Sequence, residues 1–320
     1  MIVCKFGGTA TTNKICVNNI KKLNKNKSRK IFVFSAIGKY KNNDTKLTDL
    51  LIDLCNNKKN QTELVCKIIN KFNHLCICTN ININIKREFF KILKTYQANQ
   101  NNEYLISRGE YLTTKIMSEY LGVKFIPAEK IIYFKNNKLD YKKIKNKTNY
   151  YLNKYKKIAV PGFYGIDENK NIKLFSRGGS DITGAILCKV TNSRIYENWT
   201  DINGVMQVNP LIIKSKQIKK LNYKELDLMT SCDAKVIHND CVKILQQTNK
   251  KIYVKNIFYP KNKPTKIYNN CKCLNMFIVH KIENQKVNII VHHKSGYKGC
   301  IECSLDNYKN IIQNLYQISC

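Results

Sequence analysis

The chain has 320 residues and is 43% hydrophobic, which is long and apolar enough for a sizeable core and excludes wholesale disorder. No apolar run approaches the ~18 residues of a membrane span, and the first residues lack the apolar block of a signal peptide, so we expect a cytoplasmic protein without a membrane partner. The formal net charge is +34, but only five of the 56 basic residues are Arg; an excess of Lys, Asn, Ile and Tyr reflects A/T-rich codons, so we expect no nucleic-acid partner.

The first predicted elements are two short strands that end in small residues. Apolar runs at 1–6 and 31–34 predict these strands, and the first ends at Gly7-Gly8. Adjacent glycines let backbone N–H groups approach an anion, and Lys5 beside them supplies a positive charge. The turn is therefore a candidate phosphate cradle, although an ordinary strand turn would have the same sequence.

Two helices and another strand are predicted next along the chain. Helical spacing of apolar residues occurs at 48–55 and at 104–121, and a β-rich run follows at 158–160. Glu110 lies within the second helix, where its carboxylate can accept a hydrogen bond from an ammonium or a hydroxyl group.

A second glycine-rich segment precedes a predicted helix at 181–190, which we expect Ser180 or Asp181 to cap. The free N–H groups and the positive dipole end of such a helix attract a phosphate or a carboxylate. Arg177 offers a planar fork that binds a carboxylate through two parallel hydrogen bonds, and Asp181 can bind an ammonium. The segment is therefore a candidate site for an amino acid or for an anion beside one, although a plain capped helix is the alternative.

The last predicted elements alternate again between strand and helix. Strands are predicted at 194–197 and 251–255, and helices at 225–229 and 234–245. Thr200 and Asp201 follow the first of these strands and can hold ribose hydroxyls or a base edge, but a capped turn would look the same. Lys235 and His238 lie on the last helix, and spacing alone does not single either of them out.

The order of these elements predicts the fold class. Lys- and Asn-rich stretches predict loops at 21–30, 56–60, 135–149 and 261–270. Repeated strand–turn–helix units favour an α/β fold with an open, mainly parallel sheet that binds its ligand at the carboxyl ends of the strands. The phosphate-binding P-loop, the protein-kinase signatures and the dinucleotide glycine pattern are all missing from the sequence.

The 14 cysteines do not predict a disulfide scaffold, because the chain is long and carries no secretion signal. Close pairs occur at 76/78, 271/273 and 300/303, with His292 and His293 before the last pair. The pair at 271/273 lacks the two-residue gap that zinc sites commonly use, so we expect small buried hydrophobic residues and no bound metal.

Taken in chain order, these segments resemble the aspartate kinases, which are members of the amino-acid-kinase superfamily. The matching segments lie at 5–9, 35–38, 47–51, 107–110, 160–165, 175–183, 196–201, 234–238 and 255–256, with Gly204 in addition. Each motif is moderately specific, whereas the ordered set over roughly 255 residues is highly specific.

The resemblance implies a three-layer αβα sandwich around a mainly parallel central sheet, similar to the carbamate kinases. It implies a catalytic domain at 1–270, with an N-terminal aspartate lobe at about 1–155 and a C-terminal ATP lobe at about 156–270. Residues 271–320 are similar to part of an ACT regulatory domain and are too few for the usual two. We therefore expect weak or absent feedback inhibition by lysine or threonine.

The implied activity is transfer of the ATP γ-phosphoryl group to the β-carboxylate of L-aspartate, which gives 4-phospho-L-aspartate for lysine, threonine and methionine biosynthesis. ATP would carry the Mg²⁺, and family members often form homodimers. By position the catalytic residues would be Lys5, Arg177 and Asp181. The ATP-binding residues would be Lys5, Gly7, Gly8, Ser35, Ser180, Thr200, Asp201, Met206 and Lys235. The aspartate-binding residues would be Thr48, Glu110, Arg177, Gly178, Gly179 and Asp181.

Three departures from the family pattern lie near the implied ATP site. Asn209-Pro210-Leu211 stands where Asp-Pro-Arg is usual, so a cation that would contact phosphate is missing. Ala10 replaces a usual Ser, and Asp233 replaces a usual Gly beside Lys235. These departures predict weaker ATP binding. The alternatives are a family kinase with another acceptor, a catalytically impaired homologue that acts as a binding module, and a basic RNA-binding protein.

Overall fold

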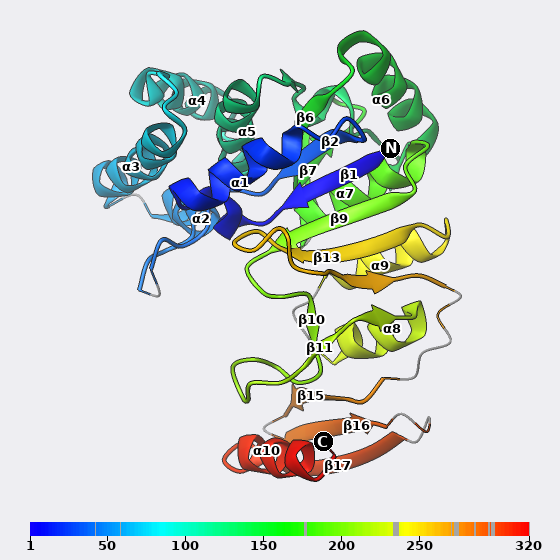
Figure 1. The fold of residues 1–320 in the computed structure, drawn as a ribbon. Helices are drawn as coiled ribbons and strands as arrows, with labels where there is room; N and C mark the ends of the chain where they lie inside the picture. The colour runs from blue at the N-terminus through cyan, green and yellow to red at the C-terminus, as the bar shows by residue number, and fades with distance from the viewer. Residues whose placement is uncertain are drawn as a thin grey trace.

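The structure is a computed structural model of the chain. It describes residues 1–41, 43–57, 59–175, 178–232, 237–269, 271, 275–284, 286–293, 295 and 298–319. Figure 1 shows a larger body, in which helices surround a sheet, and a smaller C-terminal unit at the bottom of the view. Within the described ranges, every helix is too short or too polar to span a bilayer.

The strands are β1 (Ile2–Phe6), β2 (Arg29–Phe34), β3 (Lys124–Phe125), β4 (Phe134–Lys135), β5 (Lys138–Leu139), β6 (Ile158–Pro161), β7 (Tyr164–Ile166), β8 (Ile172–Leu174), β9 (Ile195–Thr200), β10 (Val205–Met206), β11 (Gln217–Ile218), β12 (Lys220–Leu221), β13 (Lys251–Asn256), β14 (Thr265–Ile267), β15 (Phe277–Glu283), β16 (Lys286–His292) and β17 (Lys298–Ser304). The α-helices are α1 (Lys14–Asn24), α2 (Leu47–Asn56), α3 (Gln61–Thr79), α4 (Ile85–Asn99), α5 (Asn102–Leu121), α6 (Tyr141–Tyr155), α7 (Gly179–Val190), α8 (Tyr223–Ser231), α9 (Asn239–Gln246) and α10 (Tyr308–Ser319). Two short 3₁₀ helices span Gly8–Thr11 and Ala128–Lys130.

The central sheet has eight strands in the order β12-β14-β13-β9-β1-β2-β6-β3. β1 pairs in parallel with β2 and with β9, and parallel pairing continues outward to β13 on one side and to β6 and β3 on the other. β14 runs antiparallel to its neighbour β13, and β12 pairs in parallel with β14. The carboxyl ends of five long strands therefore share one edge, as the predicted α/β class requires.

The sheet separates two hydrophobic cores, because successive strand residues point to opposite faces. On one face Cys4, Phe6 and Phe32 pack with α1 to α5. On the other face Val3 and Ile31 pack with α6 to α9. This arrangement of helices on both faces confirms the expected three-layer αβα sandwich.

The C-terminal unit has a sheet and a core of its own. β15, β16 and β17 form an antiparallel sheet that is separate from the central one. Ile278, Val287 and Ile289 of this sheet pack with Ile312 and Tyr316 of α10. A small antiparallel sheet thus lies where the sequence predicts an ACT-like remnant.

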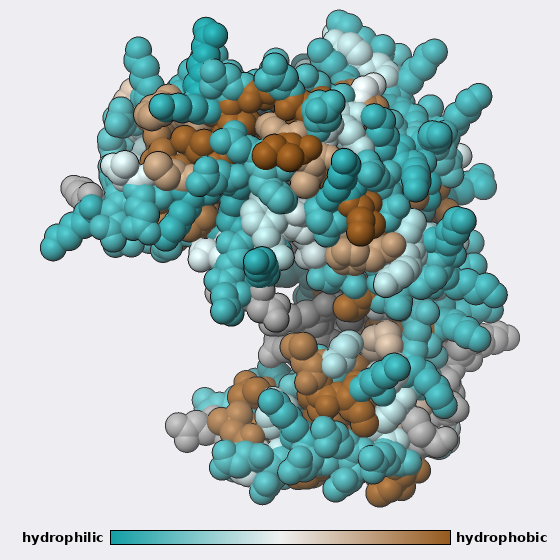
Figure 2. All heavy atoms as spheres, turned by 60° about the vertical axis from the view of Figure 1, so that its left-hand side comes forward, coloured by the Kyte–Doolittle hydropathy of each residue, from teal (hydrophilic) through white to brown (hydrophobic). Residues whose placement is uncertain are grey.

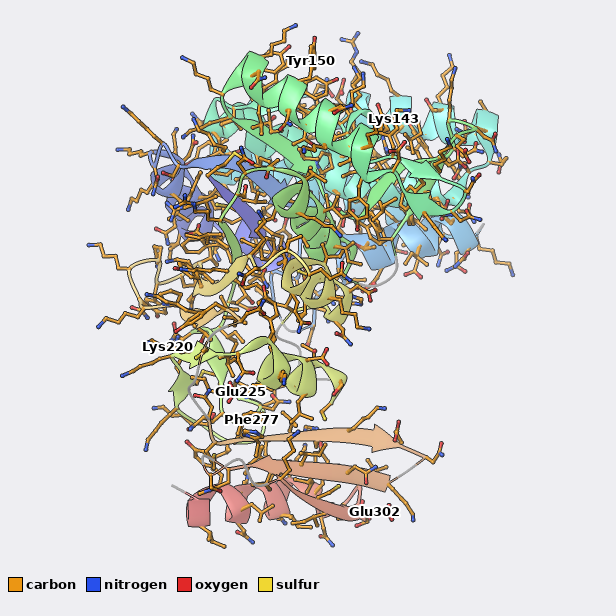
Figure 3. The ribbon with its side chains drawn as sticks, turned by 90° about the vertical axis from the view of Figure 1, so that its right-hand side faces the viewer. Lys143, Tyr150, Lys220, Glu225, Phe277 and Glu302 are labelled. Carbon is orange, nitrogen blue, oxygen red and sulfur yellow. The ribbon has the colours of Figure 1, made fainter. Side chains whose placement is uncertain are left out.

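Glu225 joins the C-terminal unit to the larger body. Its carboxylate accepts hydrogen bonds from the backbone N–H of Asn222, at the start of α8, and from the backbone and side-chain nitrogens of Asn275, just before β15. The backbone oxygen of Asn275 in turn lies 2.7 Å from Nδ1 of His292, whose ring stacks on Phe277. Figure 3 shows Glu225 and Phe277 at this junction, between α8 and the small sheet.

The strand and helix predictions are confirmed with shifted ends, except at the start of the last helix, and parts of three predicted loops are wrong. Residues 234–236 of the helix expected at 234–245 lie outside the described residues, and α9 begins at Asn239, so His238 caps this helix with an extended backbone instead of lying on it. α1 continues to Asn24 within the stretch 21–30, and β14 lies within 261–270. β9 was expected to end at Glu197 and instead continues to Thr200, because both of its edges are paired in the centre of the sheet.

The expected loop at 135–149 is the largest error, because α6 begins at Tyr141. The Asp140 side chain caps this helix by accepting from the backbone N–H of Lys143, and Ile144 and Thr148 form its narrow buried stripe. Lysine is a good helix former, so a Lys-rich sequence with few apolar residues can still form a helix once it packs on a core.

The expected cap of α7 is also wrong. Gly178 occupies the cap position with φ +78°, and Ser180 and Asp181 lie inside the helix. A Cβ atom on Gly178 would lie 2.4 Å from the His238 ring, so close packing as well as the left-handed backbone requires glycine here.

The cysteines within the described residues form no disulfide, and many of them are buried. Cys4, Cys16, Cys188 and Cys241 are fully buried among apolar side chains, as expected of small hydrophobic residues. Cys273, a member of one close pair, lies outside the described residues.

Candidate active site

Backbone hydrogen bonds tie the carboxyl ends of four parallel strands together. The N–H of Gly7, after β1, donates to the Trp199 oxygen of β9, and the N–H of Ser35, after β2, donates to the Phe6 oxygen, both at 3.1 Å. The N–H of Gly162, after β6, donates to the Phe34 oxygen at 3.0 Å. The segments that follow these strands therefore form one continuous surface at the edge of the sheet.

Glycine is required where two of these segments cross. The N–H of Gly38 donates to the oxygen of Gly8 at 3.1 Å. A Cβ atom on Gly8 would lie 2.7 Å from the Ala36 oxygen, and one on Gly38 would lie 2.8 Å from the Gly8 carbonyl carbon. Because the obstacles are backbone atoms, side chains at these two positions would force the turns apart.

An ion pair between Lys5 and Asp181 lies at this edge. Lys5 Nζ of β1 is 2.7 Å from Asp181 Oδ1 of α7, and the two side chains are only 12% and 13% exposed. The other carboxylate oxygen of Asp181 accepts from the backbone N–H of His238 at 3.2 Å. The pair links the central strand to the first turn of α7, whose N-terminal N–H groups favour an anion.

The first turn of α7 packs tightly against the segment after β6. A Cβ atom on Gly162 would lie 2.5 Å from the Ser180 hydroxyl oxygen, and one on Gly179 would lie 2.6 Å from the Phe163 ring. Ser180 is buried as a result. The glycines at these positions let the start of α7 come close to the end of β6.

Thr9, Thr200 and Asp201 form a second polar cluster. The hydroxyl of Thr9 donates to Asp201 Oδ2 at 3.2 Å, and the hydroxyl of Thr200 donates to Asp201 Oδ1 at 3.1 Å. Asn256, at the end of β13, donates to the backbone oxygen of Asp201 at 3.3 Å. The turn after β9 is thereby held from β1 on one side and from β13 on the other.

The opposite side of the site is formed by α2 and α5. A Cβ atom on Gly109 of α5 would lie 3.1 Å from both Ala36 and Leu51, so this helix packs closely on the 35–38 turn and on α2. The N–H of Leu47, at the start of α2, donates to the Ile37 oxygen at 3.3 Å. These contacts bring Thr48 and Glu110 to the same turn.

Glu110 is the most electrostatically perturbed acid of the site. Its side chain is buried, and one carboxylate oxygen, Oε2, has no hydrogen-bond partner within the described protein. Burial raises the pKa of Glu110 from 4.5 to about 8, although hydrogen bonding to the Ala36 backbone and the charge of Arg108 act in the opposite direction. A buried carboxyl group with one oxygen left without a partner is suited to receive a cationic group from a ligand.

Most of the predicted site residues meet at this edge. The structure brings together Lys5, Gly7, Gly8, Ser35, Thr48, Glu110, Gly178, Gly179, Ser180, Asp181, Thr200 and Asp201. Met206 lies on β10, where its partner is Gln217 of β11. Arg177, Lys235 and Asp233 lie outside the described residues.

Two contributors were not assigned a role from the sequence. Thr9 belongs to the first glycine motif, but only the fold shows that its hydroxyl reaches Asp201, which is 192 positions away. His238 contributes its backbone N–H to Asp181 rather than its ring. A backbone donor leaves no trace in residue identity, so no sequence signal could have found it.

The arrangement as a whole can bind a polyanion beside an ammonium group. The Lys5 ammonium, the glycine turns and the α7 start supply positive charge and N–H groups for the anion, and Glu110 and Asp181 can receive the ammonium. In Figure 1 the carboxyl ends of β1 and β9 point to the left, and Figure 2, with that side forward, shows it hollowed between the larger body and the C-terminal unit.

Comparisons with known proteins agree with this geometry. A model of the amino acid kinase family matches residues 1–256. Aspartokinase 3 of Bacillus subtilis (strain 168) is 28% identical over 290 residues, which cover 83% of this chain and 63% of that protein. The aspartokinase of Rickettsia prowazekii (strain Madrid E) is 25% identical over 285 residues, which cover 83% of this chain and 54% of that protein. The chain thus spans less than two thirds of these relatives.

Solved structures give the same result. The aspartate kinase of Clostridium acetobutylicum is 31% identical with a TM-score of 0.79, and the match covers 91% of this chain and 68% of that one. E. coli aspartokinase III in complex with aspartate and ADP shares the fold at 20% identity, with a TM-score of 0.76 and coverage of 88% and 68%. Because the family model matches most of the chain and the Clostridium protein is a close relative over most of its length, the chain belongs to the amino acid kinase family, in its aspartate kinase branch.

Proposed function

We propose that this chain transfers the γ-phosphoryl group of ATP to the β-carboxylate of L-aspartate and releases ADP and 4-phospho-L-aspartate. The observation that carries the proposal is the Lys5–Asp181 ion pair at the meeting point of the glycine turns, on the same edge as the buried acid Glu110. Relatives named aspartate kinase support this acceptor, and one of them was solved with aspartate and ADP.

The reaction needs positioning and charge neutralisation more than acid–base chemistry. The β-carboxylate of free aspartate has a pKa near 4, so it is already an ionised nucleophile at neutral pH. The difficult step brings two anions into line while negative charge spreads over the transferring phosphoryl oxygens. We assign neutralisation of this charge to Lys5, together with the N–H groups of the glycine turns.

We place the two substrates on opposite sides of the Lys5–Asp181 pair. Glu110 and Thr48, from the lobe at about 1–155, would bind aspartate, with the ammonium group on Glu110. Thr200 and Asp201, from the lobe at about 156–270, would bind the nucleotide. Arg177 would grip a carboxylate of aspartate and Lys235 a phosphate, by position in the family motifs.

Magnesium would enter this site with the nucleotide. The part of the chain that the structure describes has no group of three or more His, Cys, Asp or Glu side chains suited to hold a metal. A site with so few metal-ligating side chains fits a Mg²⁺ ion that is bound chiefly by phosphates and water, with at most one or two protein carboxylates. The ion would supply additional positive charge at the β- and γ-phosphates.

The departures from the family pattern bear on the nucleotide. Leu211 stands where the family has Arg, and its side chain is 89% exposed. This residue therefore supplies neither a positive charge for a phosphate nor a side chain packed against the protein. Ala10 is buried next to the glycine turn and removes a hydroxyl. We therefore propose an active enzyme with a raised KM for ATP.

An ATP-coupled hydroxamate assay tests the proposal. The purified chain is incubated with Mg·ATP and hydroxylamine, in parallel with L-aspartate, with L-glutamate and with no acceptor. We expect hydroxamate with aspartate at a rate at least tenfold above both other reactions. Equal rates with glutamate would point to another acceptor, and absence of hydroxamate at saturating ATP would favour an inactive binding module.

A further inference from the structure

Four donors converge on one buried carboxylate beneath the candidate nucleotide site. Glu197 of β9 accepts from Arg29 Nε at 2.8 Å and from Arg29 Nη2 at 3.1 Å. Its Oε2 atom also accepts from the indole Nε1 of Trp199 at 3.1 Å and from the Cys4 thiol at 3.3 Å. The side chain of Glu197 is only 4% exposed, and that of Arg29 is 11% exposed.

The charges of this cluster are balanced inside the protein. A buried carboxylate is tolerated only when it is paired and hydrogen-bonded, and the two-bond contact with Arg29 provides both. Burial raises the pKa of Cys4 well above its usual value, and the negative charge of Glu197 adds to this, so the thiol stays a neutral donor. The side chains of Glu197, Arg29, Cys4 and Trp199 therefore form a fixed hydrogen-bonded frame inside the protein.

Trp199 connects this frame to the two turns of the candidate nucleotide site. Its ring stacks on Phe6 with a centroid distance of 6.2 Å and an interplanar angle of 14°, and Phe6 immediately precedes the glycine turn. Its backbone oxygen accepts from the N–H of Gly7 at 3.1 Å. The next residues along the chain are Thr200 and Asp201. Rotation of the indole would therefore shift both turns together.

We infer that Glu197 is a positioning residue for nucleotide binding, because it fixes the Trp199 indole and thereby the spacing between the Gly7-Gly8 turn and Thr200-Asp201. The inference rests on the proposed function in so far as these turns bind ATP. Because the Glu197 side chain is only 4% exposed, we assign it no direct contact with a substrate. Its effect should be strongest on the nucleotide side, since Thr200 and Asp201 follow Trp199 directly, whereas Thr48 and Glu110 lie on α2 and α5 and are reached only through the crossing of Gly8 and Gly38.

Two variants separate positioning from simple destabilisation. Glu197→Gln keeps an oxygen that can accept from the indole but removes the charge that pairs with Arg29. It therefore weakens the whole frame, and not only the hydrogen bond to Trp199. Trp199→Phe keeps the Glu197–Arg29 pair and a ring against Phe6 while it removes the indole donor, so it should fold even if Glu197→Gln does not. Val190→Ala is the stability control. It opens a cavity at the far end of α7, about 16 Å along the helix from Gly179.

Calorimetric titration with Mg·ADP and steady-state kinetics provide the readout. We expect both frame variants to raise the Kd for ADP and the KM for ATP about tenfold and to leave the KM for aspartate within about twofold of wild type. Val190→Ala should lower the melting temperature and leave every one of these constants unchanged. Trp199, the sole tryptophan, should also change its fluorescence when Mg·ADP binds to the wild-type chain.

The outcomes distinguish this inference from the proposed function. Unchanged ADP affinity in a folded Trp199→Phe variant would overturn the positioning role, as would equal increases in the KM values of both substrates. Normal ADP binding by the wild type without any aspartate turnover would instead refute the proposed function, and the comparison of ADP affinities would still decide the role of Glu197.

Discussion

Lys5 has the most direct electrostatic role in the proposed reaction. Its ammonium lies 2.7 Å from Asp181 and next to the glycine turn, where a Cβ atom on Gly7 would be 3.7 Å from Nζ. A cation fixed at this point before the reaction loses no energy to reorganisation when charge develops on the phosphoryl oxygens.

Lys5→Ala should therefore abolish most phosphoryl transfer and leave the fold intact. Removal of one such preorganised group commonly costs about 10²–10³-fold in kcat. Turnover and circular dichroism measure the two parts of the prediction. Lys67→Ala on α3 is the matched control, because that lysine forms an exposed ion pair with Glu63. Near-normal turnover of Lys5→Ala would refute the assigned role.

Glu110 should make aspartate binding depend on pH. Its pKa is about 8 in the unliganded protein, so the carboxyl group is mostly protonated at pH 7 and ionises as the pH rises. The ionised form attracts the ammonium group of aspartate, so we expect the KM for aspartate to fall several-fold between pH 7 and pH 9. Glu110→Gln should raise this KM and remove its pH dependence. A flat profile in the wild type would contradict the assignment.

The same group affects stability with a defined sign. The folded-state pKa of Glu110 lies above its ordinary value of 4.5, so the fold favours the protonated form. The stability that this group contributes is complete below pH 4.5 and is lost as the pH rises through about 8. Glu110→Gln should therefore unfold at higher urea concentration than wild type at pH 9 and show little difference at pH 5.

Residue identity predicted most members of the site but not their pairing. Lys5 and Asp181 were both expected near the substrates, yet their ion pair depends on the parallel register of β1 and on the place of α7 behind it. The pKa of Glu110 likewise depends on how closely α5 packs on α2. Such quantities are set by tertiary packing, which a single sequence does not encode locally.

At the scale of elements, the crossing of the two glycine turns controls the geometry of the site. Gly8 and Gly38 approach each other through backbone atoms, and no side chain can yield to relieve a clash there. These two residues therefore determine the position of the 35–38 turn. This turn is bonded to the start of α2 and contacts α5.

Gly38→Ala should impair both stability and catalysis. The added Cβ atom would lie 2.8 Å from the Gly8 carbonyl carbon and 2.9 Å from the Thr9 nitrogen. We expect a loss of about 1–3 kcal/mol in the free energy of unfolding and a large drop in kcat. Gly122→Asn is the control: it has open space at φ +64°, which Asn tolerates, and it should retain activity. Wild-type kinetics in Gly38→Ala would show that the close approach of the two glycine turns is not required for catalysis.

Prediction of elements succeeded where the apolar periodicity was strong. The buried central strands and α5 were expected because they have continuous or periodic apolar residues. α6 was expected to be a loop because its buried stripe consists of two residues among lysines and asparagines. α1, α3 and α4 were not predicted for a similar reason: their polar residues are numerous, and their helicity depends on packing against the sheet and α5.

At the scale of the whole molecule, Glu225 is one of the contacts between the two parts, beside the packing of Phe277 and Val279 in the larger core. Its carboxylate completes the cap of α8 and holds the segment before β15, and α8 leads into 233–236, which contains Lys235.

Glu225→Gln should loosen the C-terminal unit. Glutamine cannot accept all the hydrogen bonds that the carboxylate accepts, so we expect a loss of about 1.5–3 kcal/mol in the free energy of unfolding. Glu225→Gln should speed hydrogen exchange at β15 relative to wild type more than it speeds exchange at β1. Glu302→Gln is the control: it breaks an exposed pair with Lys286, which solvent screens, and should leave stability nearly unchanged. Unchanged exchange at β15 in Glu225→Gln would show that other contacts hold the unit.

Release of ADP from Mg·ATP, measured with and without L-aspartate in wild type and Glu110→Gln, decides whether aspartate is the acceptor and Glu110 its binding residue. This assignment predicts that release by the wild type requires aspartate, and that Glu110→Gln raises the KM for aspartate at least tenfold while the KM for ATP stays within twofold. Release that is independent of aspartate, or equal effects of the substitution on both constants, would contradict it.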